Sequence, residues 1–219
     1  MLPPDAACLS SNAFVDSDHP AVVAFARQHG QGLDPGPAMV ALFYAVRDGW
    51  QYNPWRVGFT RQDFTASGVL LRPREEGGHC IDKANLLAAS ARVLGVPSRL
   101  HFADVRNHIG TARLERLLGT DRLVYHGWCE LWLDGRWVGA TPAFNKELCQ
   151  RLGVAPLEFD GQHDALFQEY DPGAGRFMEY LEDHGSHTEI PFEAMFAAWK
   201  QHYPSVRDGR WPRPDRPTG

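Results

Sequence analysis

The sequence predicts an α+β fold in which helices come first along the chain and an antiparallel sheet follows. Two observations carry this prediction. Apolar residues recur at helical spacing through the first half of the 219-residue chain. In the second half, an Asp134-Gly135 pair separates two stretches rich in aromatic and β-branched residues, which is a strong signal for a hairpin. Runs of helices before runs of strands are typical of the α+β class.

The first two helices are expected before residue 50. In "DSDHPAVVAFARQHG", residues 16–18 offer capping side chains, Pro20 suits a first turn and Gly30 ends the pattern. In "LDPGPAMVALFYAVRDGW", Asp34 can cap a helix with an apolar stripe. Residues 50–79 carry glycine, proline and scattered aromatic residues, and we expect an irregular connection there.

A third helix is expected from Cys80 to about Leu94, because "CIDKANLLAASARVL" repeats leucine and alanine at helical spacing and Gly95 follows as a C-terminal stop. "SRLHFADV" predicts a strand. Residues 106–121 are ambiguous, with a short helix possible over "ARLERLLG", and "EFDGQHDALFQEYD" reads as a small hairpin or a loop. "EIPFEAMFAAWKQHY" predicts a closing helix.

Composition narrows the function classes. The net charge is −5 with no basic run, which argues against a nucleic-acid binder. The start "MLPPDAACLSSN" lacks the features of a secretory signal and no apolar stretch is long enough to span a membrane, so we expect a cytoplasmic protein without a membrane partner. We expect one domain over residues 1–205 and a flexible tail over 206–219, which is rich in proline and lacks apolar periodicity.

The four cysteines are widely spaced and form no CxxC pair, so free thiols are expected and no metal or cofactor site is predicted. Cys80 differs from the others in its position. It follows Gly77-Gly78-His79 at a predicted helix start, where unpaired N–H groups and the helix dipole favour a thiolate. The glycines allow a tight turn and close approach of a substrate. We therefore predict that Cys80 is a nucleophile whose own N–H helps to hold an oxyanion.

The hairpin selects a histidine partner for Cys80. If Asp134-Gly135 is the turn, Leu133 pairs with Arg136 and the pairing continues outward. Alternation then puts His126 on the same face as Trp128, Glu130 and Thr141, with His126 and Thr141 as diagonal neighbours about 7–8 Å apart at Cα. A tryptophan-rich face of this kind would suit an apolar or aromatic group, although tryptophans there are more often core residues.

Together, "EGGHCIDKANLLAASARVLGVPSRL" and "YHGWCELWLDGRWVGATPAFN" resemble the transglutaminase-like superfamily, with its papain-like Cys-His-Asp fold, over roughly residues 38–145. The upstream "FYAVRDGWQYNP" is similar to the family's preceding helix. The short chain, without the β-sandwich domains of animal transglutaminases, resembles the bacterial-type members. The resemblance implies that Cys80 is the nucleophile and His126 the acid and base, and that the nucleophile helix packs on an antiparallel sheet.

One position departs from the family pattern. Where the family has Asp-Pro after the hairpin, this chain reads "ATPAFN", so Thr141 stands where the orienting aspartate is expected. A threonine hydroxyl can still accept a hydrogen bond from the imidazole, but it supplies no charge. Neutralising the acid costs a serine triad about 10⁴ in kcat, whereas papain-like proteases use a neutral Asn in this role.

A second oxyanion donor is expected from the segment before the nucleophile, where Trp50, Gln51 and Tyr52 are candidates. His79, beside the nucleophile, is expected to line the cleft. Asp82 is expected to stabilise the helix N-terminus, and Lys83 to be solvated. Glu130 is expected to be a surface or tryptophan-framed carboxylate. His163, near Asp160 and Asp164, is a weak candidate for a lid or metal site.

These features predict cysteine-dependent acyl transfer on an amide, in which Cys80 forms a thioester and His126 moves the proton. The substrate is expected to be a peptide or a small amide, and the sequence does not choose between hydrolysis and transamidation. A binding module that kept the fold without catalysis is the alternative, and Thr141 is the feature that favours it. A zinc site formed by Cys80 and His126 is a third interpretation.

Overall fold

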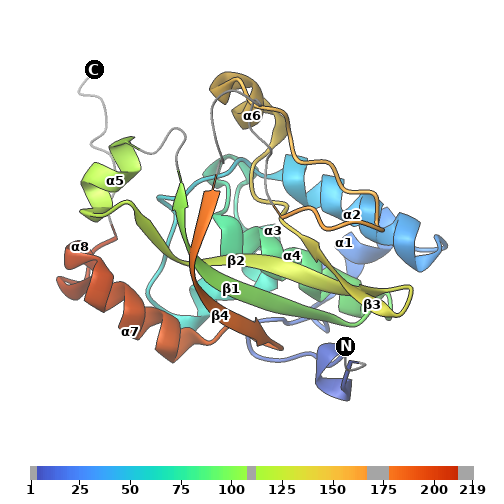
Figure 1. The fold of residues 1–219 in the computed structure, drawn as a ribbon. Coiled ribbons are helices and arrows are strands. Elements are labelled where there is room, and N and C mark those ends of the chain that lie inside the picture. The colour runs from blue at the N-terminus through green and yellow to red at the C-terminus, as the bar shows by residue number, and fades with distance from the viewer. Residues whose placement is uncertain (1–3, 108–111, 167–177, 212–219) are drawn as a thin grey trace.

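A computed structural model describes residues 4–107, 112–166 and 178–211. Its centre is a four-stranded antiparallel sheet in the order β3-β2-β1-β4 (Figure 1). The strands are β1 (Ser98–Asn107), β2 (Arg122–Leu133), β3 (Arg136–Ala140) and β4 (Met178–His187). The predicted α+β class is therefore confirmed, with the helix that starts at Cys80 packed on the sheet.

The helices of the first half gather on one side of this sheet (Figure 1). They are α1 (Pro20–Gly30), α2 (Pro35–Gly49), α3 (Ala66–Leu71) and α4 (Cys80–Val93). Short 3-10 turns precede α1 at Ala6–Cys8, α3 at Arg61–Phe64 and α4 at Arg74–Glu76. The second half adds α5 (Ala112–Leu118), α6 (Lys146–Leu152), α7 (Phe192–His202) and α8 (Pro204–Arg207). No helix in these three described ranges is long and apolar enough to cross a membrane.

Helix α4 is the centre of the core. Every residue from Ile81 to Arg92 is buried, because α1, α2 and α3 cover the helix on one side and β1 and β2 on the other. Its many alanines allow this close packing on several sides at once. This packing on both sides fixes the position of the Cys80 end of the helix.

The polar residues of α4 are buried too, and Lys83 and Asn85 tie loops to the helix. The Lys83 ammonium donates to the carbonyl oxygens of Arg47, Trp50 and Ala143 at 2.8, 2.9 and 2.7 Å. The prediction that Lys83 is solvated is wrong, since its side chain is fully buried. The three carbonyls, two of them at the end of α2, supply the partners that make this burial possible. Asn85 likewise donates to the carbonyls of Phe14 and Phe64.

The hairpin register follows the prediction. Leu133 pairs with Arg136, and the ladder continues to Cys129 and Ala140. Asp134 and Gly135 have φ values of 48° and 80°, so both turn residues are in the left-handed region that a two-residue hairpin of this kind needs. His19, rather than residues 16–18, caps α1 by accepting a hydrogen bond from the Ala21 N–H.

Three elements were not predicted: helix α3 within the expected irregular connection, strand β4 and the short helix α8. Two residues that follow the predicted boundary at residue 205 pack against the domain. Val206 is buried, and the indole of Trp211 packs against Trp199 and donates to the Pro54 carbonyl at 2.9 Å. Residues 160–166 form a loop that bridges to β3 at Ala140, and the rest of the suggested second hairpin lies outside the described residues.

Candidate active site

The N-terminus of α4 is capped by the residue that precedes Cys80. His79 Nδ1 accepts hydrogen bonds from the N–H groups of Ile81 and Asp82 at 3.2 and 3.4 Å, and Asp82 accepts one from the His79 N–H at 3.2 Å. Arg72 pairs with the Asp82 carboxylate at 3.0 Å. Because Nδ1 is an acceptor, the His79 ring is neutral, and burial lowers its pKa further. His79 lines the pocket as expected, but its ring serves as a helix cap.

The two glycines before the cap bring a second segment against the loop that precedes Cys80. Gly77 has a φ of 67°, and a Cβ added there would lie 2.3 Å from the Gln51 carbonyl oxygen. Gly78 donates to that oxygen at 2.9 Å, and the Asn53 N–H donates to Gly78 at 3.0 Å. The glycines therefore allow a close approach of the backbone at residues 51–53, which holds that segment beside Cys80.

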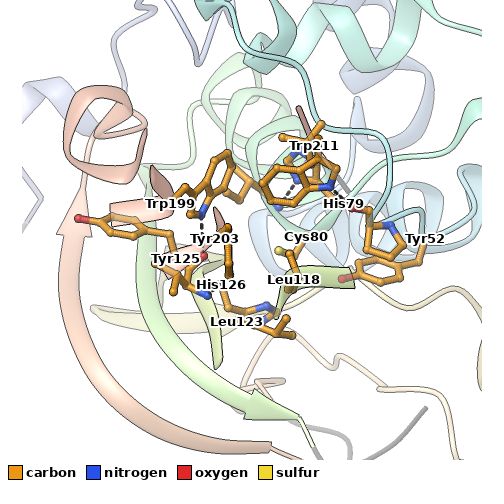
Figure 2. A pocket seen from close by; sticks show the side chains of 14 residues that line it. Tyr52, His79, Cys80, Leu118, Leu123, Tyr125, His126, Trp199, Tyr203 and Trp211 are labelled. Atoms are coloured by element: carbon orange, nitrogen blue, oxygen red, sulfur yellow. Dashed lines mark hydrogen bonds between the residues drawn. The ribbon is translucent and has the colours of Figure 1, made fainter. Parts of the chain in front are cut away.

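Cys80 and His126 line the same small pocket, with a volume of about 60 Å³ (Figure 2). In this view Cys80 is seen between His126 and Tyr52, with Trp211 above. The remaining lining is mostly apolar, and it comes from residues 52–57, the start of α4, the end of α5, the start of β2 and the C-terminal residues. It includes Val57, Ile81, Leu118, Leu123, Val124, Trp199 and Tyr203.

Tyr52 is the one candidate oxyanion donor from residues 50–52 that lines the pocket. Burial raises its pKa well above the ordinary value, so its hydroxyl keeps its proton as a donor. The hydroxyl makes no hydrogen bond to any described residue. Gln51 has an exposed side chain, and Trp50 packs against Phe25 in the core, so neither reaches the pocket.

Burial sets the protonation of the two central groups. It raises the pKa of the Cys80 thiol to about 11. Hydrogen bonds from the backbone N–H groups of Gly127, Ile81 and Cys80 itself act in the opposite direction, but their effect is smaller. Burial also lowers the pKa of His126 to about 4. The expected thiolate is therefore not the resting form, because desolvation outweighs the helix N-terminus. The pair rests as neutral thiol and neutral imidazole.

Thr141 does not orient His126 in this structure. The Thr141 N–H donates to the Ala165 carbonyl at 2.9 Å, and its hydroxyl donates to the Leu166 carbonyl at 3.4 Å. The β2–β3 ladder ends at Ala140, after which the chain pairs with residues 165–166. Within the described ranges no side chain hydrogen-bonds to the His126 ring. The orientation of the ring therefore depends on the backbone conformation around His126.

Comparison with known protein families decides the identity of the fold. The model of the transglutaminase-like superfamily matches residues 23–142, which include α4, the hairpin and Thr141. The chain belongs to this superfamily. The resemblance predicted from the two motifs is thus confirmed.

The solved structures that are similar to this chain include that of a candidate cysteine protease from Cytophaga hutchinsonii. The identity is 18% and the TM-score 0.45, over 82% of this chain and 53% of the other. The chain therefore spans about half the length of that protein. No curated protein matches the sequence.

A second, larger groove of about 640 Å³ lies on the sheet face that carries Trp128 and Trp137. Glu130 lies in it, where Arg99 and Ser186 bind its carboxylate at 2.5 and 2.6 Å. These bonds, with one from His101, lower the Glu130 pKa to about 2 against its burial. Glu130 is thus a bound carboxylate of this groove, framed by tryptophan as expected, and it does not line the Cys80 pocket.

The structure also places the four cysteines and His163, the weak candidate for a metal site. All four cysteines are free, as predicted, and Cys8, Cys129 and Cys149 are buried. His163 is exposed, and its ring pairs with Asp160 at 2.7 Å. Among the residues that the structure describes, no three His, Cys, Asp or Glu side chains come together in a way that could hold a metal.

Sequence reasoning missed the aromatic residues that the C-terminal helices contribute to the pocket. Trp199, Tyr203 and Trp211 line it from α7 and from the residues after it. The spacing of Phe196, Trp199 and Tyr203 at three and four residues was a usable signal, because it puts the three rings on one side of a helix.

Proposed function

We propose that the protein is a cysteine-dependent hydrolase or acyltransferase that acts on an amide. The observation that carries this proposal is the placement of Cys80 and His126 in one small pocket, with backbone N–H groups directed at the sulfur. A neutral thiol beside a neutral imidazole can react if the proton moves as the sulfur attacks, so that His126 acts as a general base.

The reaction starts when Cys80 Sγ attacks the carbonyl carbon and His126 takes the thiol proton. Charge develops on the carbonyl oxygen, and the Cys80 N–H and the Tyr52 hydroxyl are the donors proposed to stabilise it. The carbon–nitrogen bond then breaks, and His126 returns the proton to the leaving amine. Water attacks the resulting thioester to release the acid and restore the thiol, or a second amine attacks to form a new amide.

The pocket limits the substrate. At about 60 Å³ it admits a narrow group such as an extended peptide segment or a small side chain, and its wall of Leu118, Leu123 and Trp211 favours apolar contact. We therefore propose a peptide or small amide as the substrate.

The experiment is a screen of fluorogenic peptide amides and of amine acceptors, with the wild type, Cys80→Ser, His126→Ala and the matched control Cys8→Ser. We expect release of amine by the wild type and the control, and loss of at least about 10³-fold in kcat for the other two. Equal turnover by all four proteins would remove Cys80 and His126 from the reaction.

A binding module is the second candidate, and the absence of a described hydrogen-bond partner for His126 favours it. If the protein only binds, Cys80→Ser and wild type will bind the same peptides in a library with equal affinity, and neither will turn them over. Turnover by the wild type alone would exclude this alternative.

A further inference from the structure

Strand β2 contains a bulge immediately before His126. Ala103 of β1 pairs with His126, and the next pair is Val105 with Leu123. One residue of β1, Asp104, therefore lies opposite two residues of β2, Val124 and Tyr125. Bulges of this kind bend a strand and change the direction in which the next side chain points, and they are frequent next to active sites.

The bulge holds a strained backbone. Tyr125 has a φ of 59°, the left-handed conformation that residues with a Cβ avoid, and Asp134 in the hairpin turn is the other non-glycine case in the described ranges. Such conformations persist only where the surrounding structure enforces them.

Three buried side chains satisfy the backbone groups that leave the ladder. Asp104 Oδ1 accepts a hydrogen bond from the Tyr125 N–H at 2.8 Å. The Tyr203 hydroxyl accepts one from the Val124 N–H at 2.6 Å, and Trp199 Nε1 donates to the Val124 carbonyl at 2.9 Å. A buried backbone group without a partner is costly, so these bonds specify the bulged conformation.

Asp104 is the centre of this arrangement. Its carboxylate is 1% exposed and also binds Arg122 Nε and His184 Nε2, each at 2.7 Å. The His184 ring stacks on Tyr125 with centroids 4.1 Å apart and an angle of 8° between planes. The carboxylate therefore fixes both the backbone and the ring of the strained residue.

We propose that Asp104 is a positioning residue that aims His126 at Cys80 by holding the bulge at Val124 and Tyr125. The proposal rests on the proposed function, since it gives His126 a task. It accounts for a ring that no described side chain orients, while Thr141 bonds elsewhere. The orienting carboxylate acts here through the backbone that precedes the histidine.

The test compares Asp104→Asn in two backgrounds, wild type and Tyr125→Gly. A glycine adopts a φ of 59° without strain, so the bulge then needs less support from Asp104. We expect Asp104→Asn to lower kcat about 100-fold with little change in KM, because a misplaced catalytic group loses rate rather than binding. In the Tyr125→Gly background we expect the same substitution to lower kcat by less than about tenfold. This difference between the two backgrounds would show that Asp104 and Tyr125 are energetically coupled.

The matched control is Glu182→Gln. Glu182 is exposed and is the other carboxylate on Arg122, so this variant removes a partner of Arg122 without touching the bulge. We expect its kcat to be that of the wild type. Thermal unfolding of each variant shows whether a fall in kcat comes from an unfolded protein or from a displaced His126 in a folded one. If Asp104→Asn does not fold, Tyr203→Phe tests the bulge from its other side, and an unchanged kcat there would contradict the proposal.

A second readout does not depend on activity. The imidazole NMR signals of His126, identified by their absence in His126→Asn, should shift and broaden in Asp104→Asn and recover in the double variant with Tyr125→Gly. If these changes occur in a protein without turnover, the positioning role stands and the proposed function is wrong. An equal loss of kcat in both backgrounds, or unchanged His126 signals, would overturn the role of Asp104.

Discussion

The protonation state of two residues decides how this site would work. In a papain-like site, cysteine and histidine are expected to rest as thiolate and imidazolium. The position of Cys80 at a helix N-terminus, taken alone, favours the same ion pair. Burial acts in the opposite direction on both groups, so that the proton stays on sulfur until the attack. A site of this kind needs little charge stabilisation at rest, which fits the missing aspartate at position 141.

The pH dependence of the reaction follows from His126. Burial lowers its pKa to about 4, so the ring remains a free base as the pH falls past its ordinary value of 6.5 and becomes protonated only near 4. We expect kcat/KM to stay level from pH 7 down to about 5 and to fall only below that. A pH–rate profile checks this, and an acid limb centred at 6.5 or above would show a solvated or ion-paired histidine instead.

Thr141 should contribute little to catalysis. Its hydroxyl donates to the Leu166 carbonyl, so Thr141→Val removes one long hydrogen bond between the end of the hairpin and the loop at residues 160–166. We expect a loss of about 1 kcal/mol in unfolding free energy and less than a threefold change in kcat. Urea unfolding and steady-state kinetics measure the two. A fall of kcat by 100-fold would mean that Thr141 orients His126 after all.

At the scale of elements, the loop before α4 has one requirement that glycine alone meets. Gly77 and Gly95 both have positive φ, 67° and 77°, but a Cβ on Gly77 would collide with the Gln51 carbonyl, whereas Gly95 has open space. Alanine at either position should cost about 1–2 kcal/mol of strain. We expect Gly77→Ala alone to lower kcat as well, because it displaces the segment with Tyr52. Equal kinetics for the two variants would refute this.

Helix α4 and the end of α2 are joined by Lys83. Lys83→Met would leave three buried carbonyls without their donor, and we expect a loss of about 3 kcal/mol or more in unfolding free energy. Lys200→Met, on the exposed side of α7, is the matched control and should change stability by less than about 0.5 kcal/mol. Urea unfolding compares them, and equal midpoints would mean that the three bonds do not stabilise the fold.

For the whole molecule, the sequence predicts the parts that rest on local pattern. The α4 helix, its glycine stop and the Asp134-Gly135 hairpin were all found, because periodicity and turn chemistry act over a few residues. Strand β4 was missed since its side chains are held by charge instead of an apolar pattern. Arg106 pairs with Glu179 at 3.0 Å and His101 with Asp183 at 2.7 Å across the β1–β4 ladder.

The site itself was only partly predictable. Cys80, His126, His79 and Tyr52 could be named from motif and position, and they line one pocket. The burial of Lys83 and the bulge opposite Asp104 depend on residues far apart in sequence, so no local sequence pattern predicts them. The hydrogen bonds of Thr141 to residues 165–166 were missed for the same reason, because that segment was not expected beside β3.

The central claim is that Cys80 becomes acylated with help from His126. It is tested most directly by mass spectrometry of the protein after brief reaction with an activated acyl ester at pH 6, in wild type and His126→Ala. We expect one acyl group, located on Cys80, in the wild type and almost none in the variant. Acylation spread over Cys8 and Cys80 alike, or a Cys80 adduct that forms as fast without His126, would contradict the account.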